Sequence, residues 1–104
     1  MLNNYQAEQP ERSQIDALAA LVALDFGTDW CGHCQAAAPH IAAAVAAAGA
    51  RHIKVEDGSG RKLGRSFKVK LWPTVVVLND GVEVARVVRP LDTSAVAAAL
   101  AAAA

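Results

Sequence analysis

Trp30-Cys31-Gly32-His33-Cys34 decides how this chain is interpreted, because it holds the only two cysteines among 104 residues. It follows the apolar run Leu21-Val22-Ala23-Leu24, whose pattern predicts a buried strand. Two cysteines three positions apart lie about one helical turn from each other, so a disulfide between them closes a small ring and constrains little of the fold. Such a pair suits reversible electron transfer better than structural stabilisation.

The position of the pair relative to a helix predicts different roles for the two thiols. If Cys34 lies one turn into a helix, Cys31 lies at the helix N-terminus, where free backbone N–H groups and the positive end of the helix dipole stabilise a thiolate. A thiolate attacks a disulfide, and a second thiol nearby then resolves the mixed disulfide that forms. We therefore expect Cys31 to attack and Cys34 to resolve.

The same cysteine spacing also occurs in zinc sites, which is the main alternative. A closed zinc site needs about four ligands, and beyond the cysteines only His33, His40 and His52 offer imidazole nitrogens. We expect redox chemistry and no metal at the pair. His40 and His52 are interpreted as ordinary surface or half-buried histidines.

The length of the chain predicts one small domain, and its net charge is zero. A chain of 104 residues can bury a single core, and its ten basic and ten acidic side chains cancel, which gives no indication of nucleic-acid or membrane binding. The first eleven residues contain no Lys or Arg, so no secretory signal is expected. We therefore expect a cytoplasmic location, and in that compartment a lone cysteine pair is more often catalytic than structural. A monomer is expected.

Hydrophobic periodicity predicts an α/β order of elements. Residues 1–12 are polar and would form a flexible segment or at most a short edge strand. Asn79-Asp80-Gly81 joins two β-branched runs and is typical of a hairpin. Ser13 is expected to cap the first helix and Asp92 or Thr93 the last, and Pro39 is expected to kink the helix that contains it. The predicted helices cover residues 13–20, 32–49, 61–67 and 93–103, and the predicted strands cover residues 21–26, 52–55, 74–78 and 82–88.

Several short motifs in this order resemble the thioredoxin family over nearly the whole chain. They are Asp25-Phe26 ahead of the cysteine motif, Pro39, Lys54, Trp72-Pro73-Thr74 and Asp80-Gly81. The resemblance implies a thioredoxin fold, with a central mixed β-sheet flanked by helices and the cysteine-bearing helix starting at the carboxyl edge of the sheet. It also implies disulfide-containing protein substrates and an electron-donor reductase as partners, and nothing in the sequence indicates an organic cofactor.

Asp25 and Lys54 are the candidate acid–base residues. Asp25 ends an apolar strand six residues before Cys31, and apolar surroundings make a carboxyl group hold its proton more strongly, which suits Asp25 to take a proton from Cys34. The matching residue in thioredoxins is a buried acid with that role. The family match of Lys54 lies near this acid, so Lys54 is expected to tune Asp25 by its positive charge. A solvated Asp25 and an ordinary exposed lysine are the alternatives.

Trp72-Pro73-Thr74 and Trp30 are the candidate substrate-binding residues. By resemblance, the Trp72–Pro73 peptide bond should be cis, and the loop should face Cys31 and offer backbone groups to an extended substrate. A trans proline opening a strand is the alternative. Trp30 is a large amphipathic ring beside the attacking thiol, which suits a docking surface, although it could equally pack against the sheet.

Gly32 and His33 lie between the cysteines and are assigned to tuning the redox potential. A histidine at position 33, as in protein disulfide isomerases, can stabilise the Cys31 thiolate and so make the pair more oxidising. Our first hypothesis is a reductase of protein disulfides, and the alternative that His33 motivates is an oxidase or isomerase. A third hypothesis is an interaction module of the same fold with incidental cysteines.

Two features depart from the family pattern or extend it. Arg89 occupies the position where thioredoxins usually carry a glycine, and its bulk and charge would narrow or recharge the docking groove. Residues 61–70 carry five basic side chains and no acidic one, and this basic segment could either be a solvated face or act on the thiolate and on acidic partners. Its cations are Arg61, Lys62, Arg65, Lys68 and Lys70.

Overall fold

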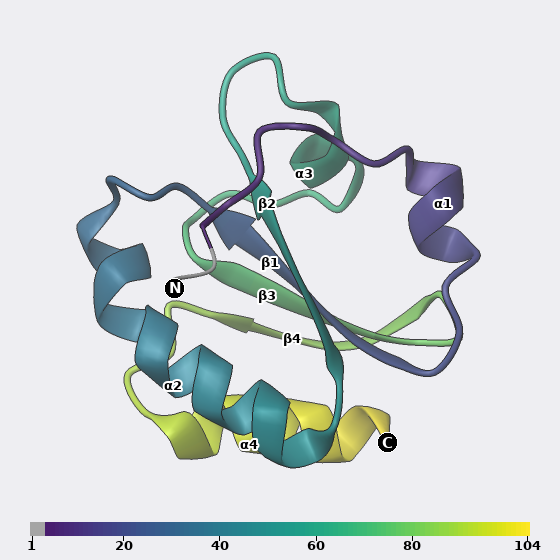
Figure 1. The fold of residues 1–104 in the computed structure, drawn as a ribbon, viewed down its shortest axis with the longest axis vertical. Helices are drawn as coiled ribbons and strands as arrows, with labels where there is room; N and C mark the ends of the chain where they lie inside the picture. The colour runs from purple at the N-terminus through teal and green to yellow at the C-terminus, as the bar shows by residue number, and fades with distance from the viewer. Residues whose placement is uncertain (1–3) are drawn as a thin grey trace.

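The computed structural model describes residues 4–104 and contains a four-stranded sheet between two layers of helices (Figure 1). The strand order is β2-β1-β3-β4. Strand β1 (Leu21–Gly27) pairs in parallel with β2 (Arg51–Glu56) and antiparallel with β3 (Thr74–Asn79), which pairs antiparallel with β4 (Val82–Val88). The mixed β-sheet of the predicted α/β thioredoxin fold is therefore confirmed.

The helices divide between the two faces of the sheet (Figure 1). Helices α2 (Gly32–Ala48) and α4 (Thr93–Ala103) lie together on one face. Helices α1 (Arg12–Asp16) and α3 (Lys62–Ser66) are single short turns on the other face. Both faces of β1 and β3 are thus covered, which is why these two strands are almost continuously apolar.

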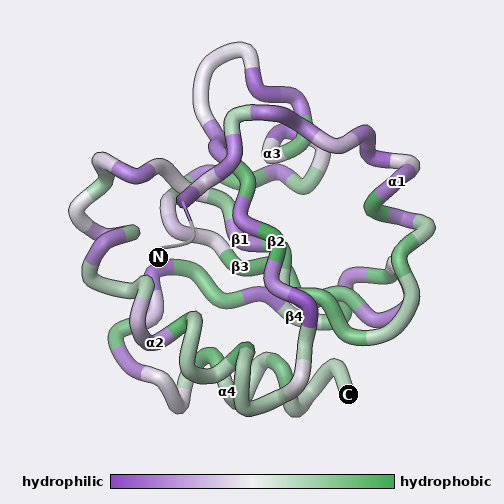
Figure 2. The backbone as a smooth tube through the Cα atoms, in the orientation of Figure 1, coloured by the Kyte–Doolittle hydropathy of each residue, from purple (hydrophilic) through white to green (hydrophobic). Residues whose placement is uncertain are grey.

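Alternation along β1 places its side chains in two separate cores, because successive residues of a strand point to opposite faces. Ala23 packs beneath α2 and α4, whereas Leu24 and Phe26 pack beneath α1 and α3, and all three are fully buried. Figure 2 shows that α4 is hydrophobic along most of its length, in keeping with its alanine-rich sequence. The same alternation puts Asp25 on the face that α2 covers.

The first helix is shorter than predicted and begins elsewhere. It is preceded by Glu11 as N-cap, not by Ser13, and it ends at Asp16. The backbone N–H of Glu11 donates to Gln14 Oε1 at 2.8 Å, which makes this the better start. Beyond the helix, Ala20 adopts a left-handed φ of 63° and cannot continue it.

The predicted hairpin forms and is tied to this turn. Asp80 and Gly81 have φ values of 51° and 82°, as a tight hairpin turn requires. The Asp80 carboxylate accepts the N–H of Ala20 at 2.7 Å, and the Asp80 N–H donates to the Ala20 carbonyl at 3.1 Å. A side chain at Gly81 would collide with the Asp16 carbonyl, so only glycine fits there.

The N-terminal segment adds one bridge at the edge of β2. Gln6 pairs in parallel with Val55, with its N–H donating to the Lys54 carbonyl at 3.1 Å and its carbonyl accepting the Glu56 N–H at 2.9 Å. Of residues 1–12, expected to be flexible or at most a short edge strand, Gln6 thus forms one isolated bridge, and residues 1–3 lie outside the described part of the chain. The bridge brings Tyr5 next to the cysteines.

Helix α2 presents the cysteine pair at the end of β1. Cys31 is the N-cap residue, and the helix runs through Pro39 to a left-handed Gly49, the predicted stop. Helix α4 is capped by Asp92, whose Oδ1 accepts the Ala95 N–H at 2.9 Å. No helix within residues 4–104 combines the length and apolar character needed to cross a membrane.

Candidate active site

Cys31 and Cys34 lie one helical turn apart, as the motif predicts, and both are free thiols. The Cys31 sulfur accepts the backbone N–H of Cys34 at 3.4 Å. Cys31 keeps 8% of its surface exposed, whereas Cys34 keeps 2% and faces the sheet. A substrate sulfur therefore has access to Cys31 and not to Cys34.

The two thiols differ strongly in acidity. Burial by itself raises the pKa of Cys31, but hydrogen bonds from the Cys34 thiol and from the backbone N–H groups of Cys34 and His33, together with the charge of Arg89, lower it below its ordinary value. Burial, reinforced by the hydrogen bond and charge of Cys31, raises the pKa of Cys34 to about 12. Cys31 is therefore the thiol that ionises first.

Asp25 is 1% exposed, and two neighbours use both of its carboxylate oxygens. The Tyr5 hydroxyl donates to Oδ1 at 2.8 Å, and His52 Nε2 lies 2.9 Å from Oδ2. Tyr5 is not among the residues expected at the site, and His52 was expected to be an ordinary surface or half-buried histidine. A signal for His52 was present, because alternation along β2 puts residues 52 and 54 on the same face as the acid; Tyr5 lies in a polar segment with no such signal.

Lys54 lies beside Asp25 in the register of β1 and β2, but its side chain takes a different partner. Its Nζ sits 4.4 Å from the centroid of the Tyr5 ring, a cation–π geometry. Among the described residues, no hydrogen bond or ion pair joins Lys54 to Asp25. The Lys54 ammonium group thus contacts the Tyr5 ring and not the Asp25 carboxylate.

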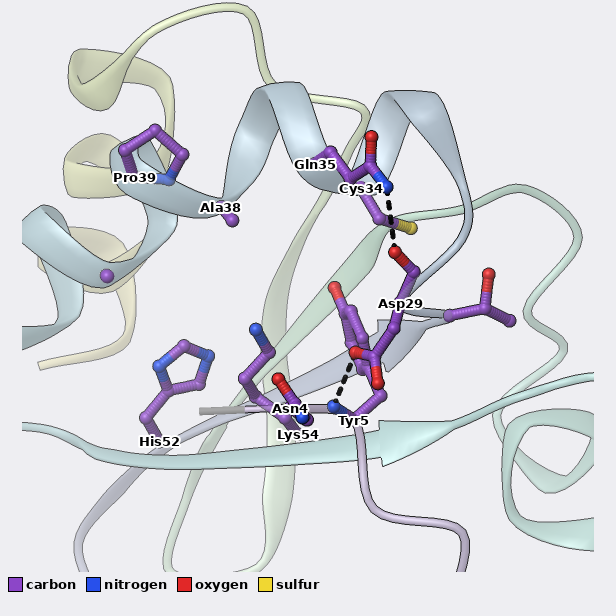
Figure 3. Close-up of a pocket in the computed structure, with 11 residues that line it drawn as sticks. Asn4, Tyr5, Asp29, Cys34, Gln35, Ala38, Pro39, His52 and Lys54 are labelled. Carbon is purple, nitrogen blue, oxygen red and sulfur yellow. Dashed lines mark hydrogen bonds between the residues drawn. The ribbon is translucent and has the colours of Figure 1, made fainter. Parts of the chain in front are cut away.

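A cavity of about 550 Å³ between α2, β2 and the N-terminal segment is lined by Tyr5, Cys34, His52 and Lys54 among others (Figure 3). Figure 3 shows Tyr5, His52 and Lys54 on the side of β2 and Cys34 across from them on α2. Asp29 fixes the tyrosine from the loop, since its Oδ1 accepts the Tyr5 N–H at 3.0 Å. The resolving thiol thus lies at the wall of a cavity that opens to solvent.

The loop before β3 has the expected conformation. The Trp72–Pro73 peptide bond is cis. Thr74 is buried and its hydroxyl donates to the Leu71 carbonyl at 2.6 Å, while the Trp72 indole N–H donates to Asp57 at 2.9 Å. These bonds hold the loop in one shape.

Trp30 and Trp72 meet edge to face, with ring centroids 5.8 Å apart. Trp30 is 73% exposed and does not pack against the sheet, so of its two predicted environments the structure has the surface one. Leu71 is half exposed nearby along the chain. An apolar rim of this kind is unusual for a solvated surface and is typical of a contact region.

Arg89 adopts a left-handed φ of 50°, the conformation that favours glycine. Its backbone N–H donates to the Pro73 carbonyl at 2.9 Å, and its Nε donates to the Trp72 carbonyl at 2.8 Å. The guanidinium is thereby tied to the loop, and its charge lowers the pKa of Cys31.

The other predicted elements of the site lie further out. Gly32 and His33 are exposed at the start of α2, and the described contact of His33 with Cys31 comes from its backbone. Four cations of the basic segment, together with Trp72, line a second cavity of about 540 Å³: Arg61, Arg65, Lys68 and Lys70. Within residues 4–104, no group of three or more His, Cys, Asp or Glu is arranged to hold a metal ion.

Comparisons with known proteins agree with this geometry. The thioredoxin family model matches residues 6–102. The reduced form of thioredoxin 2 from Pseudomonas aeruginosa PAO1 superposes with a TM-score of 0.83 at 56% identity, covering 95% of this chain and 93% of that one.

Curated relatives are more distant and match over shorter stretches. Thioredoxin C-3 of Corynebacterium nephridii is 35% identical over 74 residues, 69% of this chain and 50% of that protein. Human protein disulfide-isomerase A2 is 35% identical over 63 residues, 56% of this chain but 12% of that protein. The chain thus spans half or less of the length of these two relatives.

These similarities support thiol–disulfide oxidoreductase activity, and they agree with the fold, the free cysteine pair on α2 and the cis-proline loop. The family match covers nearly all of the described chain. The chain belongs to the thioredoxin family.

Proposed function

We propose that this protein reduces disulfide bonds in other proteins, with Cys31 as the attacking and Cys34 as the resolving thiol. The observation that carries the proposal is the asymmetry of the pair: an accessible thiol of lowered pKa next to a buried thiol with a pKa of about 12. Only the first is a competent nucleophile near neutral pH.

The reaction transfers two electrons in two exchange steps. The Cys31 thiolate attacks one sulfur of the substrate disulfide, forming a mixed disulfide and expelling the first substrate thiolate. Cys34 then loses its proton, with Asp25 as the acceptor, and attacks the Cys31 sulfur. The second substrate thiolate leaves, the substrate is reduced, and the Cys31–Cys34 disulfide forms.

The substrate is bound beside Cys31. Trp30 and Trp72 offer exposed aromatic surface, and the loop through Pro73 and Thr74 lines the approach to the sulfur. Lys54, Gly32 and His33 tune the pair. The two cysteines carry the electrons, and no further cofactor is needed. An electron-donor reductase returns the disulfide to the thiol form. A reducing compartment such as the cytoplasm suits a chain whose only cysteines are this pair.

The second candidate function reverses the electron flow. Whatever stabilises the Cys31 thiolate makes the pair more oxidising, and the lowered pKa of Cys31 favours a disulfide oxidase or isomerase on this ground. Equilibration with glutathione of known redox ratio separates the two candidates. A potential at the reducing end supports the reductase, and a potential near that of oxidising enzymes contradicts it.

Reduction of insulin by dithiothreitol tests the activity itself. The wild-type protein should accelerate the reaction, and Cys31→Ser should abolish the acceleration. Cys34→Ser should instead accumulate a mixed disulfide through Cys31. If no acceleration depends on the cysteines, both redox candidates are wrong and only an interaction module with incidental cysteines remains.

A further inference from the structure

Cys34 has no direct bond to the acid that is to receive its proton. Among the described residues, the hydrogen bonds of the Asp25 side chain go to the Tyr5 hydroxyl and to His52, at 2.8 and 2.9 Å. The Cys34 sulfur and the Tyr5 hydroxyl instead both lie against Gly27, and the two side chains belong to one buried cluster. The phenol therefore bonds the carboxylate and lies next to the thiol.

Gly27 makes this arrangement possible at the end of β1. A Cβ at this position would lie 2.6 Å from the Cys34 sulfur, 2.7 Å from Tyr5 Cζ and 2.8 Å from the Tyr5 hydroxyl oxygen. Contacts this short are not tolerated, so any larger residue would push the thiol and the phenol apart. The glycine thus leaves room for both groups to meet.

We propose that the Tyr5 hydroxyl carries the proton between the Cys34 thiol and the Asp25 carboxylate during resolution. The proposal deepens the proposed function and rests on it. Tyr5 touches the reacting thiol and is a catalytic residue in this account, whereas His52 is a positioning residue that holds the second oxygen of the acid.

The transfer balances within the three groups. The Cys34 thiol passes its proton to the phenol oxygen while the phenol passes its own proton to Asp25 Oδ1. The Cys34 thiolate then forms a bond to the Cys31 sulfur, and the bond from Cys31 to the substrate sulfur breaks. Tyr5 ends as a neutral phenol, and Asp25 ends as a carboxylic acid.

Tyr5 is suited to relay a proton without ionising. Burial, followed by the negative charge of Asp25, raises its pKa far above the ordinary range, so a free tyrosinate does not accumulate. Lys54 Nζ sits 4.4 Å from the ring centroid, where it offsets negative charge that develops as the protons move. His52, whose Nε2 lies 2.9 Å from Asp25 Oδ2, lines the same cavity as Tyr5 and Cys34.

The test separates attack from resolution in one reaction. The reduced protein is mixed rapidly with one equivalent of an aromatic disulfide that releases a coloured thiolate at each exchange. The first release reports Cys31 attack, and the second reports Cys34 resolution. Tyr5→Phe, which keeps the ring, should leave the first rate within about twofold and slow the second by roughly tenfold or more, because positioned proton transfer contributes at least that much.

Two further variants keep the test decisive if Tyr5→Phe is unstable. Gly27→Ala retains the hydroxyl but separates it from the thiol, and it should also slow the second release. Gln9→Ala removes another bond of the N-terminal segment, from Gln9 to the Glu56 carbonyl at 2.8 Å, and should change neither rate. A second release that is unchanged in Tyr5→Phe or in Gly27→Ala overturns the relay.

Asp25→Asn distinguishes failure of the relay from failure of the proposed function. If Asp25→Asn slows the second release and Tyr5→Phe does not, Asp25 acts without the phenol and the relay is wrong. If neither variant slows it, the role of Asp25 in the proposed function is also wrong. Loss of the first release in Cys31→Ser remains the check on the attacking thiol.

Discussion

The surroundings of Cys31 and Cys34 differ more than their separation of one helical turn suggests. Cys31 faces the loop of Trp72 and Pro73, with a cation and backbone N–H groups around its sulfur. Cys34 faces the sheet and a buried cluster of Tyr5, Asp25 and His52. The comparison shows that the fold gives the two neighbouring thiols different surroundings, one suited to attack and the other to resolution.

The largest effect is expected when one of the two thiols is replaced. Cys31→Ser should lose all cysteine-dependent reduction of insulin, while Cys34→Ser should keep the rate of the first exchange and stall as a mixed disulfide. Mass spectrometry of the trapped species checks the assignment. A mixed disulfide trapped through Cys34 in Cys31→Ser, with none through Cys31 in Cys34→Ser, would show that the roles of the two thiols are reversed.

The next largest effect is expected at alkaline pH, where ionisation of the buried Cys34 should lower the stability of the folded protein. The pKa of Cys34 is raised from its ordinary value of 9.0 to about 12, so the unfolded chain loses this proton before the folded protein does. The stabilising contribution of the neutral thiol is complete below pH 9.0 and declines as the pH rises toward 12.

Urea unfolding of the reduced protein across this pH range measures the decline. Cys34→Ala removes the titrating group while leaving the lysines and Tyr5 in place, so its free energy of unfolding should fall less steeply with pH than that of the wild type. Equal slopes for the two proteins would contradict the raised pKa.

A smaller effect is expected on the exposed side. Arg89→Gln removes the charge that helps to lower the pKa of Cys31, and it should slow alkylation of Cys31 near neutral pH by about two- to fivefold, the range of a partly exposed charge pair. Arg89→Lys keeps the charge and should retain most of the rate. The difference between the variants should shrink in high salt.

The smallest effect should come from the basic segment. Replacing Arg61, Lys62 and Arg65 with glutamine should leave the alkylation rate of Cys31 within about twofold, since it is Arg89 that contributes charge at the sulfur. Reduction of a negatively charged substrate should slow modestly and in a salt-dependent way, because these charges steer it toward Trp72. Unchanged rates for acidic and neutral substrates would leave the segment as a solvated face.

Much of the fold follows from local sequence. The apolar runs of β1 and β3 predict buried strands, Asn79-Asp80-Gly81 predicts the hairpin, and Gly49 predicts the end of α2. The first helix was predicted too long because its end depends on a distant partner, the Asp80 carboxylate, which holds the Ala20 N–H. Local propensity does not contain such a contact.

The residues of the site likewise divide into those that the local sequence predicts and those that it does not. The cysteines, Asp25 and the Trp72–Pro73 loop could be predicted because each belongs to a motif or to a strand end. Tyr5 could not, since its polar segment carries no strand pattern and meets β2 through an isolated bridge at Gln6. The expected partner of Asp25, Lys54, has the right register, but its Nζ lies over the Tyr5 ring, 4.4 Å from the ring centroid.

The difference in acidity between the two thiols is the central claim, and their separate titration tests it most directly. The reduced protein is alkylated in brief pulses over a range of pH, and mass spectrometry of its peptides follows each cysteine. Cys31 should be labelled with a pKa below its ordinary value, while Cys34 should resist labelling until the pH approaches 12. Two thiols that titrate together, or Cys34 ionising first, would contradict the account.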